Sequence, residues 1–138
     1  MTWIVGGVTP VGQAFLIGDT RVTFDDCREA DLIKKVHWVG RDIVAGFSGS
    51  VKIGFALLTD LATRLRLEGQ PEAVWKPEAL AKVWSGDAER LFSEFDEREG
   101  VLRCSILLAA VAPRNNGPFP FATLIEMRSP RFKPQIRP

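Results

Sequence analysis

The stretch TWIVGGVTPVGQAFLIGD, residues 2–19, decides the fold. Two apolar runs, residues 3–8 and 13–18, flank the turn sequence TPVG at residues 9–12. Proline fixes φ in such a turn and glycine accepts a positive φ, so the pattern predicts a β-hairpin. The first run is β-branched and apolar with little alternation, which predicts a strand that is buried on both faces.

The predicted hairpin begins directly after Thr2. Removal of Met1 would make Thr2 the N-terminal residue, with a hydroxyl nucleophile and a free α-amine base on the same residue. The alternative is that Met1 stays in place and that residues 2–19 are only a first hairpin. Taken alone, this stretch favours the alternative.

Composition places the chain among ordinary globular proteins. Its 138 residues are 46% hydrophobic and 25% charged, which predicts a single domain over residues 1–138 with a core of its own. A net charge of +1 gives no electrostatic reason to expect nucleic-acid or membrane-surface binding. Cys27 and Cys104 are too few for a disulfide framework, and no apolar run is long enough to cross a membrane. We therefore expect a cytoplasmic protein.

The rest of the chain divides into alternating apolar patterns and turns. The charged segment 25–31 predicts a solvated loop, and Asp25 and Asp26 have no further oxygen ligand at a fixed spacing, so we expect no metal site. The expected elements are strands 33–39 and 43–45, a helix capped by Ser50, a helix from Pro77 to Gly100, and strands 102–111 and 121–127. Residues 128–138, with three prolines and four basic residues, predict an extended tail. The order ββββ-αα-ββ indicates an α+β fold with helices packed over antiparallel sheet.

Three further features carry possible chemistry. Lys35 interrupts an apolar strand, which by itself favours a charged edge strand, and Asp19 at a strand end is usually a turn former. The segment Gly46-Phe47-Ser48-Gly49-Ser50 is too short for a phosphate-binding loop and does not fit a nucleophile elbow. It would instead suit an oxyanion hole at the start of a helix, where backbone N–H groups point outward.

Together these features fit a terminal threonine. An α-amine titrates at about 7.7–8.0 in model compounds, and a neighbouring lysine cation lowers its pKa further. Asp19 would hold Lys35 in place and keep it charged. The neutral amine could then accept the proton of the Thr2 hydroxyl, while Gly46, helped by Gly49, stabilises the oxyanion. No metal or organic cofactor is required.

At compatible spacing, four segments resemble the proteasome β-subunit and HslV-type peptidases, which are N-terminal nucleophile hydrolases. They are TWIVG at residues 2–6, GDTRVT at residues 18–23, KKV at residues 34–36 and AGFSG at residues 45–49. The likeness is greatest to the small bacterial homologues that begin Met-Thr, and it covers residues 2–68 well. The resemblance implies a four-layer αββα sandwich and a threonine endopeptidase.

The resemblance also implies roles for single residues. Thr2 is nucleophile and base, Asp19 and Lys35 form the supporting ion pair, and Gly46 is the oxyanion donor. Backbone groups of Thr23 and Gly49 would bind a peptide or unfolded protein substrate as an added strand. The pocket for the side chain before the scissile bond would be lined by Val22, Ile33 and His37. Family members assemble as stacked rings, and the ring symmetry and any ATPase partner stay open.

The sequence also departs from the family pattern. A later Gly-Ser-Gly turn, an Asp/Ser pair and the C-terminal helices of the family have no counterpart among the 138 residues. We therefore expect a C-terminally truncated member. Two alternatives follow: a non-catalytic ring or scaffold subunit, inactive through truncation or a retained Met1, and a related amidase that acts on small amides.

Overall fold

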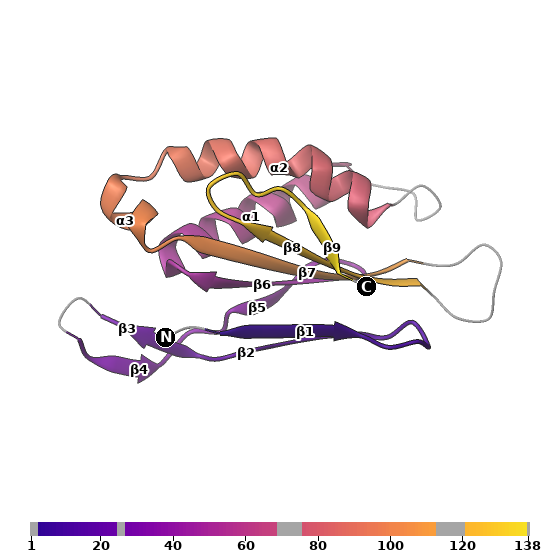
Figure 1. Ribbon diagram of the computed structural model, residues 1–138, viewed down its shortest axis with the longest axis horizontal. Helices are drawn as coiled ribbons and strands as arrows, with labels where there is room; N and C mark the ends of the chain where they lie inside the picture. Colours follow the sequence, from indigo (N-terminus) through magenta and orange to yellow (C-terminus); the bar gives the residue numbers. More distant parts are fainter. Residues whose placement is uncertain (1–2, 25–26, 69–75, 113–120, 138) are drawn as a thin grey trace.

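The computed structural model describes residues 3–24, 27–68, 76–112 and 121–137, and these form a mixed α and β fold in layers (Figure 1). Helices α1 (Val51–Glu68) and α2 (Pro77–Ser93) cover one face of a five-stranded sheet. The hairpin of β1 (Ile4–Val8) and β2 (Ala14–Gly18) packs on the other face. A helix layer and two sheet layers are thus present in the described residues, and the second helix layer of the expected αββα sandwich is not among them.

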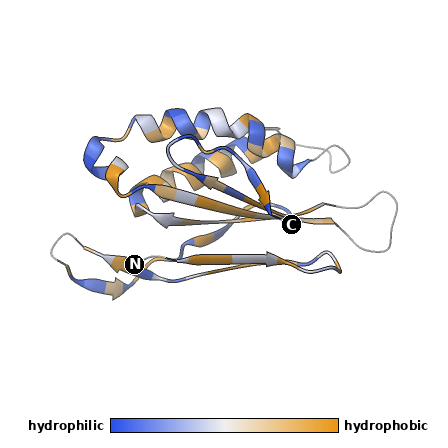
Figure 2. Cartoon of the chain, in the orientation of Figure 1, coloured by the Kyte–Doolittle hydropathy of each residue, from blue (hydrophilic) through white to orange (hydrophobic). Residues whose placement is uncertain are grey.

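The five-stranded sheet is an antiparallel meander. Its order is β5 (Val36–Gly40), β6 (Ile43–Gly49), β7 (Cys104–Ala112), β8 (Phe121–Arg128) and β9 (Gln135–Arg137). The strongly apolar β7 lies at its centre, as expected for a strand with neighbours on both edges (Figure 2). Strand β6 runs through Gly49, so the glycine-rich segment predicted as a loop is the end of a strand. Pairing with both β5 and β7 outweighs the low strand propensity of glycine.

The predicted first hairpin is confirmed, but only one of its faces is covered. The strands pair from Ile4↔Gly18 to Val8↔Ala14, and Gly12 closes the turn with a φ of +78°. Odd-numbered residues therefore share the surface turned away from the five-stranded sheet, which we call the outer hairpin face. Its large side chains are about half exposed: Trp3 49%, Val5 51%, Phe15 47% and Ile17 54%. The prediction of burial on both faces is wrong for the described residues.

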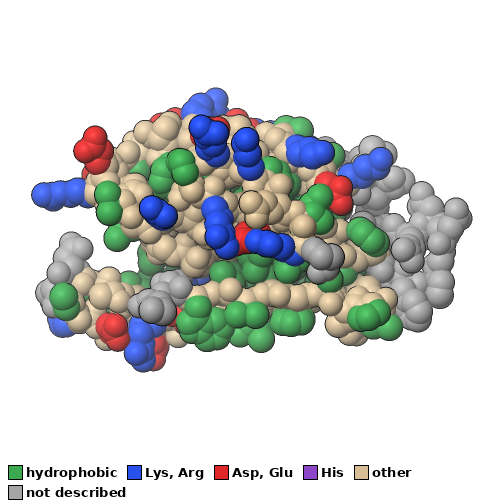
Figure 3. All heavy atoms as spheres, in the orientation of Figure 1, with side chains coloured by type: hydrophobic (Ala, Val, Ile, Leu, Met, Phe, Trp, Pro, Cys, Tyr) green, Lys and Arg blue, Asp and Glu red, His purple; other side chains and the backbone are tan. Residues whose placement is uncertain are grey.

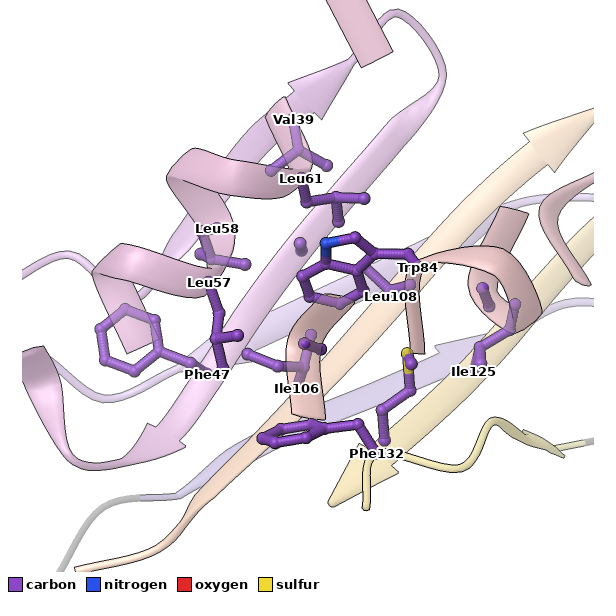
Figure 4. Packing of buried hydrophobic residues seen from close by; sticks show 14 of the residues in the cluster. Val39, Phe47, Leu57, Leu58, Leu61, Trp84, Ile106, Leu108, Ile125 and Phe132 are labelled. Carbon is purple, nitrogen blue, oxygen red and sulfur yellow. The ribbon is translucent and has the colours of Figure 1, made fainter. Parts of the chain in front are cut away.

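The core lies between the helices and the five-stranded sheet (Figure 4). Trp84 of α2 is fully buried at its centre, and its indole N–H donates to Asp60 Oδ2 of α1 at 2.9 Å. Arg64 and Asp87 add an ion pair between the same helices. Helical spacing after Ser50 predicts an apolar stripe of Val51, Phe55, Leu58, Leu61, Ala62 and Leu65, and all of these pack into the core. The same spacing predicts an inward Val83 on α2, but Val83 is 63% exposed, because it lies about 100° around the helix from Trp84.

Several predicted boundaries shift. The second helix ends at Ser93, and a short helix α3 (Glu97–Val101) follows Asp96, whose side chain caps it. Part of the charged segment predicted as a loop is strand β4 (Glu29–Asp31), which pairs with β3 (Arg21–Thr23). Asp25 and Asp26 lie outside the described residues.

Residues 128–137 fold onto the molecule rather than extending from it. Phe132 is fully buried, and the Ser85 hydroxyl donates to its carbonyl oxygen at 2.8 Å. Beyond it, β9 adds the last strand of the sheet, with Arg137 opposite Leu124. The extended tail was predicted from the prolines and basic residues of this segment. That composition gives no sign that one aromatic residue, Phe132, is buried and holds the segment against the core. In the described residues, no helix combines the length and apolar character that crossing a membrane requires.

Candidate active site

The centre of the candidate site is a buried ion pair. Lys35 lies just before β5, its side chain is 0% exposed, and its Nζ donates to Asp19 Oδ1 at 2.9 Å. The same Nζ donates to the carbonyl oxygen of Arg21 at 2.5 Å. A buried ammonium group is tolerated only when it is paired and hydrogen-bonded, as here. Lys35 is therefore not the exposed edge residue that the strand pattern alone favoured.

Asp19 also ties this pair to the start of the chain. The Trp3 N–H donates to Asp19 Oδ1 at 3.4 Å, and the Asp19 N–H donates to the Trp3 carbonyl oxygen at 3.3 Å. Trp3 follows Thr2 in the sequence, and Thr2 itself lies outside the described residues. One carboxylate thus binds the Lys35 cation and the backbone next to the predicted nucleophile.

Gly46 lies in the middle of β6, beneath the first strand. It pairs with Val36 of β5 and Leu107 of β7. A Cβ atom at this position would stand 1.9 Å from Ile4 Cδ1, so only glycine lets β1 lie this close. Gly46 is thus in a strand and not at the helix start where the sequence predicted it, and its role as oxyanion donor stays a prediction.

The predicted helix cap is confirmed at the end of the same strand. Helix α1 begins at Val51, and the Ser50 Oγ accepts a hydrogen bond from the Ile53 N–H at 3.2 Å. Gly49, the last residue of β6, has a φ of +96°, and a Cβ there would stand 2.4 Å from the Arg103 carbonyl oxygen. Both the backbone angle and the close approach require glycine at this position.

The predicted substrate-binding residues fall in two places. Val22 is half-buried and Thr23 exposed on β3, and Ile33 is half-buried, with its N–H donating to the Thr20 carbonyl oxygen at 3.1 Å. His37, in contrast, packs edge-on against Phe55 of α1 at 5.6 Å between ring centroids.

Alternation over the expected strand 33–39 predicts that Lys35 and His37 share one face, and this prediction is wrong. Lys35 precedes the regular strand and turns towards β2, whereas His37 faces the helix layer. The two side chains therefore lie on different sides of the sheet. His37 contacts α1 and does not lie with the predicted substrate-binding residues of β3.

Other side chains offer less chemistry. Within residues 3–24, 27–68, 76–112 and 121–137, no group of three or more His, Cys, Asp or Glu could hold a metal ion. Cys27 is exposed, whereas burial raises the pKa of the Cys104 thiol to about 12, which keeps it protonated and unreactive at neutral pH.

The sequence did not reveal the Arg21 carbonyl oxygen as a hydrogen-bond partner of Lys35. Every residue has a backbone carbonyl, so no residue type marks this acceptor in the sequence.

Comparison with known proteins supports the architecture. No family model matches the sequence, and no curated protein matches it. Among solved structures, the chain is similar to eukaryotic HslV from Trypanosoma brucei, with a TM-score of 0.57 and 18% sequence identity. The match covers 91% of this chain and 62% of the HslV chain, so this chain spans about 62% of the length of that protein. The chain therefore has an HslV-like fold of the proteasome β-subunit type.

Proposed function

We propose that the chain is a subunit of a proteasome-like threonine endopeptidase whose nucleophile is Thr2 after removal of Met1. The observation that carries the proposal is the buried pair of Lys35 and Asp19, bonded to the backbone of Trp3 and hence adjacent in sequence to Thr2. A buried lysine with a carboxylate partner is an expensive arrangement for an ordinary hairpin. Next to a terminal amine, however, a buried lysine cation would disfavour protonation of that amine, and the amine must be neutral to act as a base.

The proposed reaction uses this chain's own groups. The neutral α-amine of Thr2 accepts the hydroxyl proton as the hydroxyl oxygen attacks the peptide carbonyl carbon. The Gly46 N–H stabilises the resulting oxyanion. Collapse expels the amine of the leaving peptide, which takes the proton back from the Thr2 ammonium group, and leaves an ester on Thr2. Water activated by the same amine then hydrolyses the ester. The Lys35 cation, held by Asp19, is proposed to favour the neutral form of the Thr2 amine.

The substrate we propose is an extended segment of peptide or unfolded protein. Thr23 of β3 pairs with Glu29, and Gly49 at the end of β6 pairs with Cys104; the substrate is proposed to add as a strand on the opposite edge of these exposed residues. Val22 and Ile33, both half-buried, are proposed to line the pocket for the side chain before the scissile bond. Such a pocket favours medium or large apolar side chains.

The proposal extends to the assembly. A second helix layer over the outer hairpin face would complete the four-layer αββα sandwich, because Trp3, Val5, Phe15 and Ile17 form an apolar surface there. We propose a cytoplasmic, stacked-ring homo-oligomer in which the long helix α1 serves subunit contacts as well as the core. The HslV-like fold supports this arrangement.

Two measurements test the proposed nucleophile. Intact-mass analysis of the native protein should show that Met1 is absent from the mature form. In a fluorogenic peptide assay, Thr2→Ala should abolish cleavage, whereas Thr63→Ala, a matched change at an exposed position of α1, should leave it unchanged.

The possible outcomes separate the candidate functions. Equal rates for wild type and Thr2→Ala would exclude Thr2 as the nucleophile. A retained Met1 in the mature assembly would identify a non-catalytic ring subunit. Cleavage of small amides without cleavage of peptides would identify an amidase.

A further inference from the structure

Ser50 makes a second side-chain contact that helix capping does not need. Its Oγ accepts from the Ile53 N–H as the α1 cap, and its hydroxyl proton is donated to Glu99 Oε2 of α3 at 2.8 Å. Ser50 is 2% exposed, and Glu99 is half-buried. A hydrogen bond to a carboxylate is stronger than one between neutral groups. The bond spans 49 positions of sequence and joins the start of α1 to the segment that precedes β7.

Helix α3 is hydrogen-bonded at both of its ends. The Asp96 side chain accepts from the Glu99 N–H at 2.9 Å, which fixes the first turn. At the other end the Arg103 N–H donates to the Gly100 carbonyl oxygen at 3.1 Å. The Arg103 carbonyl oxygen then accepts from the Ser50 N–H at 2.9 Å. Ser50 is therefore bound to this segment twice, once through its backbone and once through its side chain.

Gly49 lies directly before this doubly held residue. It pairs with Cys104 of β7, and its φ of +96° together with the 2.4 Å approach of the Arg103 carbonyl oxygen to a would-be Cβ requires glycine there. On its other side the chain is exposed, and the position of Ser50 sets where the Gly49 backbone groups point. Loosening Ser50 would let the end of β6 move away from its present place.

We propose that Glu99 is a positioning residue for substrate binding, acting through Ser50 on the backbone of Gly49. The inference rests on the proposed function, in which an extended substrate pairs with Gly49. The proposed role of Glu99 is to hold Ser50 in place, not to take part in the reaction. Its loss should weaken the binding of extended peptides and leave the reactivity of Thr2 unchanged.

Three variants of the native chain in its mature assembly test this role. Glu99→Ala removes the acceptor, whereas Glu99→Gln keeps a carbonyl oxygen that still accepts from the Ser50 hydroxyl. Glu97→Ala is the matched control, because Glu97 lies exposed on the same short helix. For each variant we would measure kcat and KM on an extended fluorogenic peptide, the rate of Thr2 acylation by a small β-lactone, and amide exchange over residues 48–53.

The expected pattern is a split between binding and chemistry. Glu99→Ala should raise KM about five- to tenfold, because only part of the energy of a hydrogen bond to a charged group is passed on to substrate binding, with kcat within about twofold of wild type. Lactone acylation should be unchanged, amide exchange over residues 48–53 should be faster, and Glu99→Gln should restore KM and exchange.

Other outcomes overturn the inference. Unchanged amide exchange in Glu99→Ala would refute the positioning role whether or not peptides are cleaved. So would an unchanged KM, a loss confined to kcat, or an equal effect of Glu97→Ala. Failure of the proposed function would look different, because wild type would then either not react with the lactone or react with it without cleaving the peptide.

Discussion

At position 35 a buried ammonium group donates to acceptors from two other residues, the Asp19 carboxylate and the Arg21 carbonyl. Lys35→Met keeps the aliphatic stem but leaves Asp19, 12% exposed, without its cation. We expect this variant to assemble, to lose about 1–3 kcal/mol in free energy of unfolding, and to show no peptide cleavage. Chemical denaturation and the fluorogenic assay measure the two effects. Retained cleavage would contradict the role of Lys35 in setting the amine pKa.

Gly46 allows the steric and catalytic demands on one residue to be separated. Gly46→Ala keeps the backbone N–H but places a methyl group 1.9 Å from the present position of Ile4 Cδ1. We expect a loss of about 1–3 kcal/mol in free energy of unfolding from this overpacking. Ile4→Val removes Cδ1, so the double variant should recover part of the loss in chemical denaturation. An identical loss with and without Ile4→Val would show that the contact is not the cause.

The sequence singled out Lys35 as a charge in an apolar run, and Asp19, Gly46 and Gly49 because together with Lys35 they supply what a terminal threonine needs. The ion pair could be anticipated from the resemblance. The Arg21 carbonyl and the Glu99 contact could not, since a backbone acceptor and a contact across 49 positions leave no local pattern. The shared face of Lys35 and His37 was mispredicted because strand alternation was extended to Lys35, whereas Lys35 precedes β5, which begins at Val36.

At the scale of elements, an ion pair between Arg137 and Glu126 links β9 to β8. Glu126 of β8 is 16% exposed and accepts hydrogen bonds from Arg137 of β9 and from Arg128. Partial burial acts to raise the pKa of Glu126, but the hydrogen bonds from Arg137 and Arg128 outweigh it, and the pKa is lowered. The carboxylate is therefore more favoured in the folded chain than in the unfolded one.

This pKa shift predicts a pH-dependent contribution to stability. Because the folded-state pKa lies below the ordinary value of 4.5, the contribution is present above that pH and is lost as the pH falls through the folded-state pKa. We expect Glu126→Gln to be less stable than wild type by about 0.5–1 kcal/mol at pH 7, since the arginines are well exposed. The difference should vanish in acid. Urea denaturation at several pH values measures it, and a constant difference would contradict the assignment.

The elements that could be predicted are those whose pattern is repeated over several residues. The apolar stripe of α1 follows from helical spacing and the central strand β7 from a continuous apolar run, and the Ser50 cap adds a residue type typical of helix starts. The end of β6 and the whole of β9 did not, because both depend on pairing with distant strands that overrides glycine and proline. Composition near a chain end is a poor guide when one aromatic residue, Phe132, decides where the segment packs.

At the scale of the whole molecule, the described layers leave the outer hairpin face open. Figure 3 shows hydrophobic side chains gathered along β1 and β2, below the five-stranded sheet. An apolar surface of this kind promotes association. We expect the double variant Val5→Thr, Ile17→Thr to form smaller assemblies than wild type in light scattering after size exclusion.

The matched control is Val83→Thr with Val101→Thr, which changes two isolated exposed valines on the helices. This control should leave the assembly size unchanged. If the control and the hairpin variant shift the size equally, the outer hairpin face has no special part in association.

The hydrogen bond from Lys35 to the Arg21 carbonyl oxygen links the proposed catalytic group to the proposed substrate-binding strand. Arg21 opens β3, two positions before Thr23, so the group proposed to tune the terminal amine also fixes the strand proposed to receive the substrate. A substitution at position 35 is therefore expected to impair both the chemistry and the alignment of the substrate strand. A second substitution that restored activity would have to repair both.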